Sequence, residues 1–365
     1  MKWRRTEAQK RASVGIASYG WYVPVSRLDM HTLAEQWGMS EAHERVFRLN
    51  GRNSIAVSAL DEDSATLGIE AAERAMAALP QGHPLPQSIH VGSESHVYAV
   101  KPTAVIIAEA LRLTPGVFAV DLEFACKAGT AALLSSAACV AAGYIESGLA
   151  IGADCPQSAP GSLLEASVGA GAAAFVVGSR DLIAVIDGLA SVASDVTDFW
   201  RRDTRQFPQV AGKFSVDEGY MEHSRRAVVE LFEATGTKPG DYRFACFHQP
   251  YASLPLALGK ALGFRRDQIT PGLVSGKIGN TYSSATLLSV CTVLDLAQPG
   301  DRILFASFGS GAGSDAAALT VTAEIEQFRR RRAGGAAPFA EEISGESARW
   351  FSYGQYAHAQ GKLRP

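Results

Sequence analysis

The second half of this chain repeats the first, and this repeat limits the possible folds more than any other feature of the sequence. The run SIHVGSES carries Glu94, and the run FACFHQP carries His248, which lies 154 residues later. The same spacing separates Cys126 from Asn280, and each of these two residues opens a long uncharged stretch. Self-similarity at a fixed period indicates an internal duplication, here with a pseudo-twofold axis.

Other segments fit the same repeat. The run GLAIGAD aligns with RILFASF at this spacing, and VGAGAAAFVVG resembles GSGAGSDAAALTV as a second version of one glycine-rich hairpin. In duplicated α/β units, the C-terminal ends of the central strands and the N-termini of the buried helices converge. We therefore expect Glu94, Cys126, His248 and Asn280 to surround one pocket.

Short apolar runs alternate with longer helical patterns along the whole chain, which predicts βαβ units and a layered α/β fold. The uncharged stretch 128–145 reaches the lower length limit of a membrane span. Its richness in Ala, Ser, Gly and Thr favours a buried central helix instead. We expect strands at 14–20, 88–95, 117–124, 148–154, 172–179, 182–190, 244–250, 301–309 and 316–323, and helices at 64–79, 103–113, 128–145 and 278–294.

These patterns divide the chain into an N-terminal half (12–180), a C-terminal half (181–325) and a tail (326–365). The tail opens with the arginine run 329–332, which we interpret as a solvated helix end, with anion binding as the alternative. Its aromatic residues are expected to pack the tail onto the body or onto a partner.

Composition excludes several classes of function. The chain has 365 residues and a formal net charge of -3, from 34 Lys+Arg and 37 Asp+Glu, so it lacks the basic excess of a nucleic-acid-binding protein. Its 5 cysteines are scattered, with no CxxC pair. This distribution argues against a disulfide framework or a metal site and predicts a reducing, cytoplasmic location. The basic N-terminus lacks a secretory cleavage pattern, and we predict no association with a membrane.

Cys126 is the candidate nucleophile. It stands where the strand VFAVDLEF gives way to the uncharged helix, and a helix N-terminus stabilises a thiolate and lowers the pKa of the thiol. Taken alone, it is better explained as a small apolar side chain in a tight turn, because free cysteine is often buried. The other cysteines lie inside apolar runs and are expected to be core residues: Cys139, Cys155, Cys246 and Cys291.

Three further residues and a loop could complete such a site. His248, held by the following Gln249-Pro250, can serve as the base or acid partner of a cysteine. Glu94, if partly desolvated, has a raised pKa and can exchange a proton. Asn280 can donate its amide to a carbonyl oxygen, and the glycine loop 307–315 can form an oxyanion hole from backbone amides. Each also has a purely structural explanation, and their convergence on one pocket favours function.

The segments DLEFACKAGTAAL, GSESHVYAVKPT, FHQP, GNTYSSA and SFGSGAGSDA resemble the 3-hydroxy-3-methylglutaryl-CoA synthases of the thiolase superfamily, in particular their archaeal-type branch. The insertion 198–220 is also similar, and the resemblance runs from about Val14 through the tail. Glu94 distinguishes this family from the ketoacyl-carrier-protein synthase III group, which has Cys, His and Asn but no such Glu. The resemblance implies a thiolase-like fold, with a duplicated βαβαβ unit in five αβαβα layers.

It further implies a reaction. Cys126 would be acetylated by acetyl-CoA, and Glu94 would remove a methyl proton. The enolate would attack acetoacetyl-CoA, which His248 and Asn280 orient, and water would release 3-hydroxy-3-methylglutaryl-CoA for the mevalonate pathway. No cofactor beyond the CoA thioesters is implied. Backbone amides at Cys126 and near Ser310 would bind the oxyanion, and the remaining implied substrate contacts are Tyr282, Gly309, Lys213, Arg201 and Arg202.

One departure from the family concerns CoA binding. Relatives carry a lysine soon after the histidine, whereas here Ser253 stands in that neighbourhood and no basic residue precedes Lys260. An alternative function is therefore an acyltransferase subunit in a specialised-metabolism complex. The resemblance implies a homodimer, and archaeal-type relatives assemble with a thiolase and a small OB-fold, zinc-ribbon scaffold protein, so such partners are expected under either function.

Overall fold

The computed structural model describes residues 2–4, 13–202, 204–311, 313–332 and 338–363. Within these residues, its N-terminal part contributes five strands to the main sheet, in the order β6-β5-β7-β8-β2. β5 runs parallel to both β6 and β7, and β8 runs antiparallel to β7 and to β2. The strands span Gly15–Tyr22 (β2), Ser88–Gly92 (β5), Phe118–Leu122 (β6), Ser147–Asp154 (β7) and Gly171–Gly178 (β8).

The C-terminal part repeats this arrangement in the order β12-β13-β14-β9. β12 runs parallel to β13, and β14 is antiparallel to β13 and β9, as β8 is to its own neighbours. Because β2 also pairs with β9, the two sets of strands join into one continuous sheet, and the short β1 (Lys2–Arg4) pairs with β9 as well. The strands are β9 (Ala184–Ala193), β12 (Phe244–Phe247), β13 (Arg302–Ala306) and β14 (Gly313–Val321).

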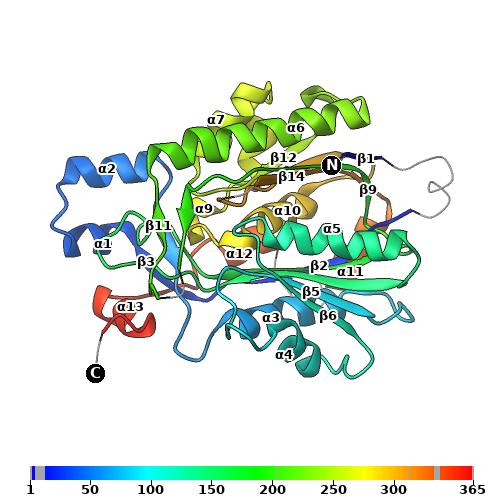
Figure 1. Ribbon diagram of the computed structural model, residues 1–365, viewed down its shortest axis with the longest axis horizontal. Helices are drawn as coiled ribbons and strands as arrows, with labels where there is room; N and C mark the ends of the chain where they lie inside the picture. The colour runs from blue at the N-terminus through cyan, green and yellow to red at the C-terminus, as the bar shows by residue number, and fades with distance from the viewer. Residues whose placement is uncertain (1, 5–12, 203, 312, 333–337, 364–365) are drawn as a thin grey trace.

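Helices and strands alternate in five layers (Figure 1). α3 (Ser64–Ala77) and α4 (Thr103–Ala110) cover the outside of the N-terminal strands, and α6 (Glu222–Thr235) and α7 (Ser253–Leu262) cover the outside of the C-terminal strands. Between the two layers of strands lie α5 (Ala128–Ala141) and α10 (Ala285–Leu296). The predicted duplicated α/β fold with its buried central helices is confirmed, although the second of these helices begins at Ala285 rather than at residue 278.

Burial explains why α5 has no charged residue and why α10 has none before Asp295, near its end. Every residue of α10 from Ala285 to Leu294 is buried, and the α10 side chains share one apolar cluster with Leu133 and Val140 of α5 and with the inner faces of both sets of strands. Desolvating a charged side chain there would cost several kcal/mol. Among the described residues no helix has both the length and the apolar character that crossing a bilayer requires.

The exact symmetry of the central helices differs from the sequence prediction. The turn before each helix contains a non-glycine residue in the left-handed region, Ala125 (φ 47°) before α5 and Tyr282 (φ 49°) before α10. These two residues are 157 positions apart rather than 154, so the counterpart of Cys126 is Ser283. Asn280 lies three residues further from the helix. The spacing of 154 holds approximately for β5 and β12 and for β7 and β13, but not for β8 and β14 or for these turns, because the two halves differ in loop length.

A smaller module carries the tail. β3 (Ser26–Asp29) pairs with β4 (Ser54–Ala56) and with β15 (Arg349–Trp350), and the helices packed around this sheet include α13. In α13, Tyr356 is buried. After the end of this helix, Lys362 Nζ lies 2.6 Å from Glu165 Oε1, and both side chains are shielded from solvent. The remaining helices are α1 (Met30–Gln36), α2 (Glu41–Leu49), α8 (Arg266–Ile269), α9 (Ser275–Ile278), α11 (Glu324–Arg332), α12 (Phe339–Glu342) and α13 (Tyr353–Ala359).

The arginine run at the end of α11 is not the solvated helix end that the sequence suggests. Arg332 pairs with Asp295 at 2.6 Å and lies over the Trp21 ring, 5.0 Å from its centroid. Arg329 donates to backbone carbonyls at the end of α10, and Arg331 donates to the carbonyl of Ala78. Three of the four guanidinium groups therefore fasten α11 to the core. Arg329 does so by donating to carbonyls at the end of α10, where helix carbonyls lack partners within the helix.

Candidate active site

Cys126 lies in the left-handed turn between β6 and α5. Ala125 in the left-handed region reverses the chain sharply, which leaves Cys126 buried two residues before the helix begins. Its thiol lies within reach of the side chains of Glu94 and Asn280, both of which influence its pKa. The structure thus brings three of the predicted residues, from both halves of the chain, close together.

The pKa of the Cys126 thiol is raised well above its ordinary value, mainly by burial and next by the negative charge of Glu94. The expectation of a pKa lowered by the helix N-terminus is therefore wrong. A helix dipole contributes at most about 2 kcal/mol, which cannot offset desolvation in an acidic surrounding. The resting nucleophile is a thiol, and it needs a base.

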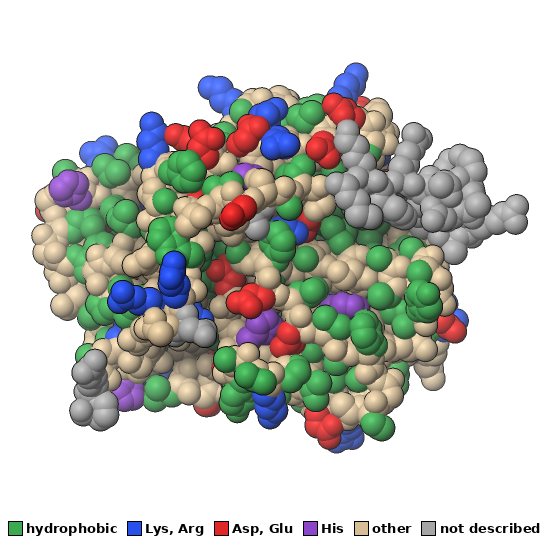
Figure 2. Space-filling view, viewed as in Figure 1, with side chains coloured by type: hydrophobic (Ala, Val, Ile, Leu, Met, Phe, Trp, Pro, Cys, Tyr) green, Lys and Arg blue, Asp and Glu red, His purple; other side chains and the backbone are tan. Residues whose placement is uncertain are grey.

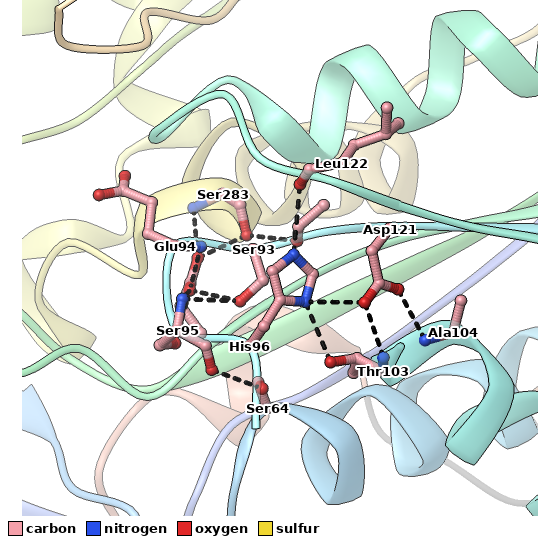
Figure 3. Close-up of polar contacts among 12 residues, drawn as sticks. Ser64, Ser93, Glu94, Ser95, His96, Thr103, Ala104, Asp121, Leu122 and Ser283 are labelled. Carbon is pink, nitrogen blue, oxygen red and sulfur yellow. Dashed lines mark hydrogen bonds and ion pairs between the residues drawn. The ribbon is translucent and has the colours of Figure 1, made fainter. Parts of the chain in front are cut away.

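Glu94 follows β5 by two residues. Figure 3 shows its carboxylate pointing away from the hydrogen bonds that hold the backbone of Glu94 and Ser95. Burial raises the pKa of Glu94 to about 8, with a smaller contribution from the nearby carboxylate of Asp154. Its Oε1 is shielded from solvent and has no hydrogen-bond partner among the described residues. A carboxyl group with a pKa near neutrality and a free oxygen can exchange a proton with a substrate.

Asp154 holds the loop that presents Glu94. It is fully buried at the end of β7. Its Oδ1 accepts from the backbone amides of Glu94 (2.8 Å) and Ser95 (2.9 Å) and from two serine hydroxyls, while Oδ2 accepts from the amide (2.9 Å) and hydroxyl (2.6 Å) of Ser283. One carboxylate thus ties the two halves together. Sequence reasoning missed it, although an acidic residue closing the apolar run GLAIGAD was a usable signal.

His248 directly follows β12 and is buried, which lowers its pKa to about 3. Its backbone amide donates to the carbonyl of Ala306, and its own carbonyl accepts from the Tyr220 hydroxyl at 2.8 Å. Gln249 locks the turn behind it by bonding to the backbone of residues 272, 274 and 275. The imidazole is therefore neutral, and its ring lies 6.5 Å from that of Phe308, which precedes the glycine loop.

Asn280 and Tyr282 form the turn that leads into α10. The amide of Tyr282 donates to Asn280 Oδ1 at 3.0 Å, which directs the Asn280 NH2 group outward from the turn. The backbone of Asn280 is fixed on both sides, because its amide donates to Ser167 (2.7 Å) and its carbonyl accepts from Gly169 (2.9 Å). The Tyr282 hydroxyl is buried without a partner among the described residues.

The glycine loop packs against the Cys126 turn. A Cβ atom on Gly309 would lie 2.6 Å from the carbonyl oxygen of Phe124 and 2.8 Å from Cγ of Lys127, so only glycine fits there. The amides of Gly309, Gly311 and Gly313 already donate within the fold. Ser310, between the first two, is half-buried, and its amide has no partner within the described part of the chain.

A cavity of about 400 Å³ has Glu94 and Tyr282 in its wall, and Ala125, also in the wall, places the Cys126 turn directly behind it. His248, Asn280 and the glycine loop are not among the residues of this wall, so the predicted convergence on one pocket is met only in part. Figure 2 shows acidic side chains and a histidine gathered at the centre of this face, with basic side chains to their left. The remaining ionisable residues of the wall are Glu62, Asp63, His96, Glu123, Cys155 and Arg201. Cys155 is therefore a wall residue and not the core residue that the sequence suggests, whereas Cys246 and Cys291 are buried as expected.

The residues predicted to contact CoA differ in their distance from the cavity. Arg201 lines the cavity, from the hairpin of β10 (Phe199–Trp200) and β11 (Gln209–Val210). Arg202 is exposed beside it, and the Lys213 side chain is 90% exposed, 3.8 Å from Asp217. Ser253 opens α7 and donates to Asn50 at 3.3 Å, and it is not among the residues of the cavity wall.

The duplicated five-layer fold and a buried thiol close to a carboxylic acid define a condensing enzyme of the thiolase-like class. The profile of the 3-oxoacyl-[acyl-carrier-protein (ACP)] synthase III C-terminal family matches residues 232–321. Among solved structures, an HMG-CoA synthase complexed with CoA has a TM-score of 0.84 at 21% identity and covers 97% of this chain and 92% of its own. The HMG synthase of the curacin biosynthetic pathway, in complex with holo donor-ACP, has a TM-score of 0.82 at 22% identity, covering 95% and 88%.

Curated relatives identify the family within this class. A hydroxymethylglutaryl-CoA synthase of Methanosarcina acetivorans is 44% identical over 96% of this chain and 99% of its own length. One from Aeropyrum pernix is 43% identical over 96% of this chain and 95% of its own length. The chain belongs to the hydroxymethylglutaryl-CoA synthase family, in its archaeal-type branch, as the sequence resemblance predicts, and it is an acyl-condensing transferase.

Proposed function

We propose that this protein condenses acetyl-CoA with acetoacetyl-CoA to give 3-hydroxy-3-methylglutaryl-CoA. The observation that carries the proposal is the close approach of Cys126, Glu94 and Asn280 beside the 400 Å³ cavity, because it combines a nucleophile, a carboxyl group with a pKa of about 8 and an amide donor. Family membership supports the same reaction.

The first step is acetylation of Cys126. The thiol, with its raised pKa, passes its proton to the nearby Glu94 carboxylate as Sγ attacks the thioester carbonyl of acetyl-CoA. The oxyanion that forms is bound by backbone amides at Cys126 and Ser310. Its collapse expels CoA, whose thiolate takes up the proton. Glu94 is then ionised again and faces the acetyl group.

The second step makes the carbon–carbon bond. Glu94 removes a proton from the methyl group of acetyl-Cys126, and the enolate carbon attacks the ketone of acetoacetyl-CoA. His248 and Asn280 donate hydrogen bonds to that ketone oxygen. Because burial keeps His248 neutral, the imidazole acts as a neutral donor. The proton that Glu94 took from the methyl group passes to the alkoxide, which returns Glu94 to its ionised form. Water finally hydrolyses the thioester to Cys126 and releases the product.

The charge of the cavity suggests how CoA lies. Four carboxylic side chains line the wall and Arg201 is its one guanidinium, so the anionic phosphates of CoA are disfavoured inside. The uncharged pantetheine arm fits there instead. We place the phosphates at the rim, near Arg201, Arg202 and Lys213, all of which belong to the 198–220 insertion.

Incubation with labelled acetyl-CoA, followed by acetoacetyl-CoA, tests the proposal. We expect label on Cys126, release of one CoA, and then a branched product. Labelled enzyme that yields no product with acetoacetyl-CoA would overturn the synthase function in favour of the acyltransferase-subunit alternative. An enzyme that takes up no label would indicate a scaffold role.

We also propose a homodimer that forms through β6. This strand lies at the edge of the sheet, and Phe118 within it is 58% exposed. Tyr98, Val100 and Val105 nearby in the fold are exposed as well, and an apolar sheet edge of this kind favours pairing with a second copy. The measurement is sedimentation equilibrium, with Phe118→Lys expected to give a monomer.

Two further proposals follow from the family. The archaeal-type branch supports an assembly with a thiolase and an OB-fold, zinc-ribbon scaffold protein, in which the product enters the mevalonate pathway. The five cysteines are all free, which supports a cytoplasmic location. Co-purification from cells of the native host tests the assembly.

A further inference from the structure

Directly after the nucleophile stands a buried ion pair that the reaction described above does not use. Lys127 Nζ lies 3.0 and 2.9 Å from the two carboxylate oxygens of Asp315, and the two side chains are only 6% and 3% exposed. The ammonium group also sits 3.9 Å from the centroid of the Phe124 ring. Lys127 is the N-cap residue of α5, and Asp315 lies in β14, so the pair joins the two halves of the chain.

Hydroxyl groups complete the surroundings of this pair. Asp315 Oδ1 accepts from Ser191 at 2.6 Å, and Oδ2 accepts from Thr130 at 3.2 Å. Thr130 is in turn 2.6 Å from the hydroxyl of Ser307, at the start of the glycine loop. The first turn of α5 is therefore bound to both ends of the glycine loop, at Ser307 and at Asp315.

The two segments that this pair connects are those that supply the oxyanion-binding amides. Cys126 is the neighbour of Lys127, and Ser310 lies in the loop that Ser307 and Asp315 enclose. Gly309 already touches the stem of Lys127. An oxyanion hole works only when its donors are held about 2.7–3.1 Å from the developing charge, so the gap between the two segments must be fixed.

We propose that the Lys127–Asp315 ion pair is a positioning device, which sets the gap between the Cys126 turn and the glycine loop and thereby the geometry of the oxyanion hole. The proposal rests on acyl transfer at Cys126, as proposed above. Neither side chain touches the reacting atoms. Loss of the pair should slow reactions that pass through an oxyanion and spare those that do not.

Two reactions of the same thiol separate these cases. Acylation by acetyl-CoA or by p-nitrophenyl acetate forms a tetrahedral oxyanion, whereas alkylation by iodoacetamide is a direct displacement without one. We expect Lys127→Met and Asp315→Asn each to slow both acylations at least ~10-fold, since removing one oxyanion donor costs 10²–10³-fold. Alkylation of Cys126 should change less than ~3-fold.

Two further variants keep the test decisive. The double variant Lys127→Met with Asp315→Asn removes both charges and should fold even where a single variant does not, because an uncompensated buried charge is the main cost. We expect it to acylate as slowly as either single variant. Lys362→Met breaks an equally buried pair, Lys362–Glu165, which does not join the Cys126 turn to the glycine loop, and should lower the melting temperature without changing the ratio of acylation to alkylation.

The outcomes are distinct. Parallel loss of acylation and alkylation, or no loss of either, overturns the positioning role. A double variant that acylates at the parental rate also overturns it. If the parent reacts with p-nitrophenyl acetate but not with acetyl-CoA, the proposed function fails, while the selective effect on the ester still supports the role of the pair.

Discussion

The two halves of this molecule have the same layered arrangement of strands around a central helix, yet they meet the pocket with different chemistry. In each half a left-handed turn precedes the central helix, at Ala125 and at Tyr282. The next residue is Cys126 in one half and Ser283 in the other. The Cys126 thiol faces Glu94 and Asn280, whereas the Ser283 hydroxyl donates to Asp154 and to the carbonyl of Gly92.

This difference shows how a duplicated site becomes a single one. The geometry that could present a nucleophile exists twice, but in the C-terminal half it is filled by a serine whose amide and hydroxyl are both bonded to the other half. The Cys126 turn carries the reacting thiol, and the Ser283 turn fixes the relative position of the two halves. The experiments below aim to break or sharpen this contrast.

The largest effect is expected at Cys126. Cys126→Ala should abolish acetylation and lower kcat at least ~10³-fold, because no other side chain takes over the covalent step. Mass spectrometry after exposure to acetyl-CoA is the measurement, with Cys155→Ala on the cavity wall as a control that keeps its label. Adding Ser283→Cys to Cys126→Ala should not restore labelling. If it does, the two turns are chemically interchangeable and the contrast is lost.

Glu94→Gln should come next. We expect condensation to fall ~10²–10⁴-fold, the usual contribution of general acid–base catalysis, while acetylation falls less. Separate rates for acetyl-enzyme formation and product release check this. Glu123→Gln, another carboxyl group of the wall, serves as the matched control, and an equal loss in both variants would mean that the cavity needs negative charge rather than a base.

The pH dependence of condensation tests the same group. Since burial raises the pKa of Glu94 to about 8, the carboxylate that acts as base is the minor form at neutral pH. The rate should rise with pH and level off above about 8, losing roughly tenfold for each pH unit below that point. A rate that is flat between pH 5 and 8 would show that Glu94 ionises near its ordinary value.

Ser283→Ala should act on stability more than on chemistry. Its hydroxyl donates to the buried Asp154 carboxylate at 2.6 Å, and hydrogen bonds to charged groups contribute about 1.5–3 kcal/mol. Urea unfolding measures the loss. Ser284→Ala, whose hydroxyl bonds only to backbone carbonyls, should cost about 1 kcal/mol. Equal costs would mean that Ser283 is not a special link between the halves.

The smallest effect is expected in the insertion that belongs to neither repeat. Arg201→Ala should raise the KM for acetyl-CoA by about fivefold with little change in kcat, because exposed ion pairs contribute on the order of 1 kcal/mol. Lys213→Ala, at a fully solvated position, should change the KM less than ~3-fold. Steady-state kinetics measure both KM values. A larger increase for Lys213→Ala than for Arg201→Ala would place the CoA phosphates nearer Lys213.

The sequence predicts the strands, the central helices and the residues at the strand ends because those features are local. Apolar runs identify β5 and β12, and the residues that follow them are Glu94 and His248. The register of the turns was wrong by three residues, because a constant spacing cannot show where loops differ in length.

Features that depend on partners distant in the sequence could not be predicted in this way. The roles of Asp154 and Asp315 appear only when the two halves are folded together, since each is bonded to residues from the opposite half. The raised pKa of Cys126 has the same origin, because Glu94 and burial outweigh the helix dipole that the local sequence suggests. The arginines of α11 bind acceptors on α10 and at the end of α3, and the charge pattern of the sequence alone cannot identify these partners.

The shared central layer also has a consequence for synthesis. The apolar face of α5 is covered by α10, which leaves the ribosome roughly 155 residues later, or ~8–30 s at typical rates of translation. During that interval the nascent N-terminal half carries an uncovered apolar surface. Slow translation between the halves would lengthen the period in which aggregation competes with folding.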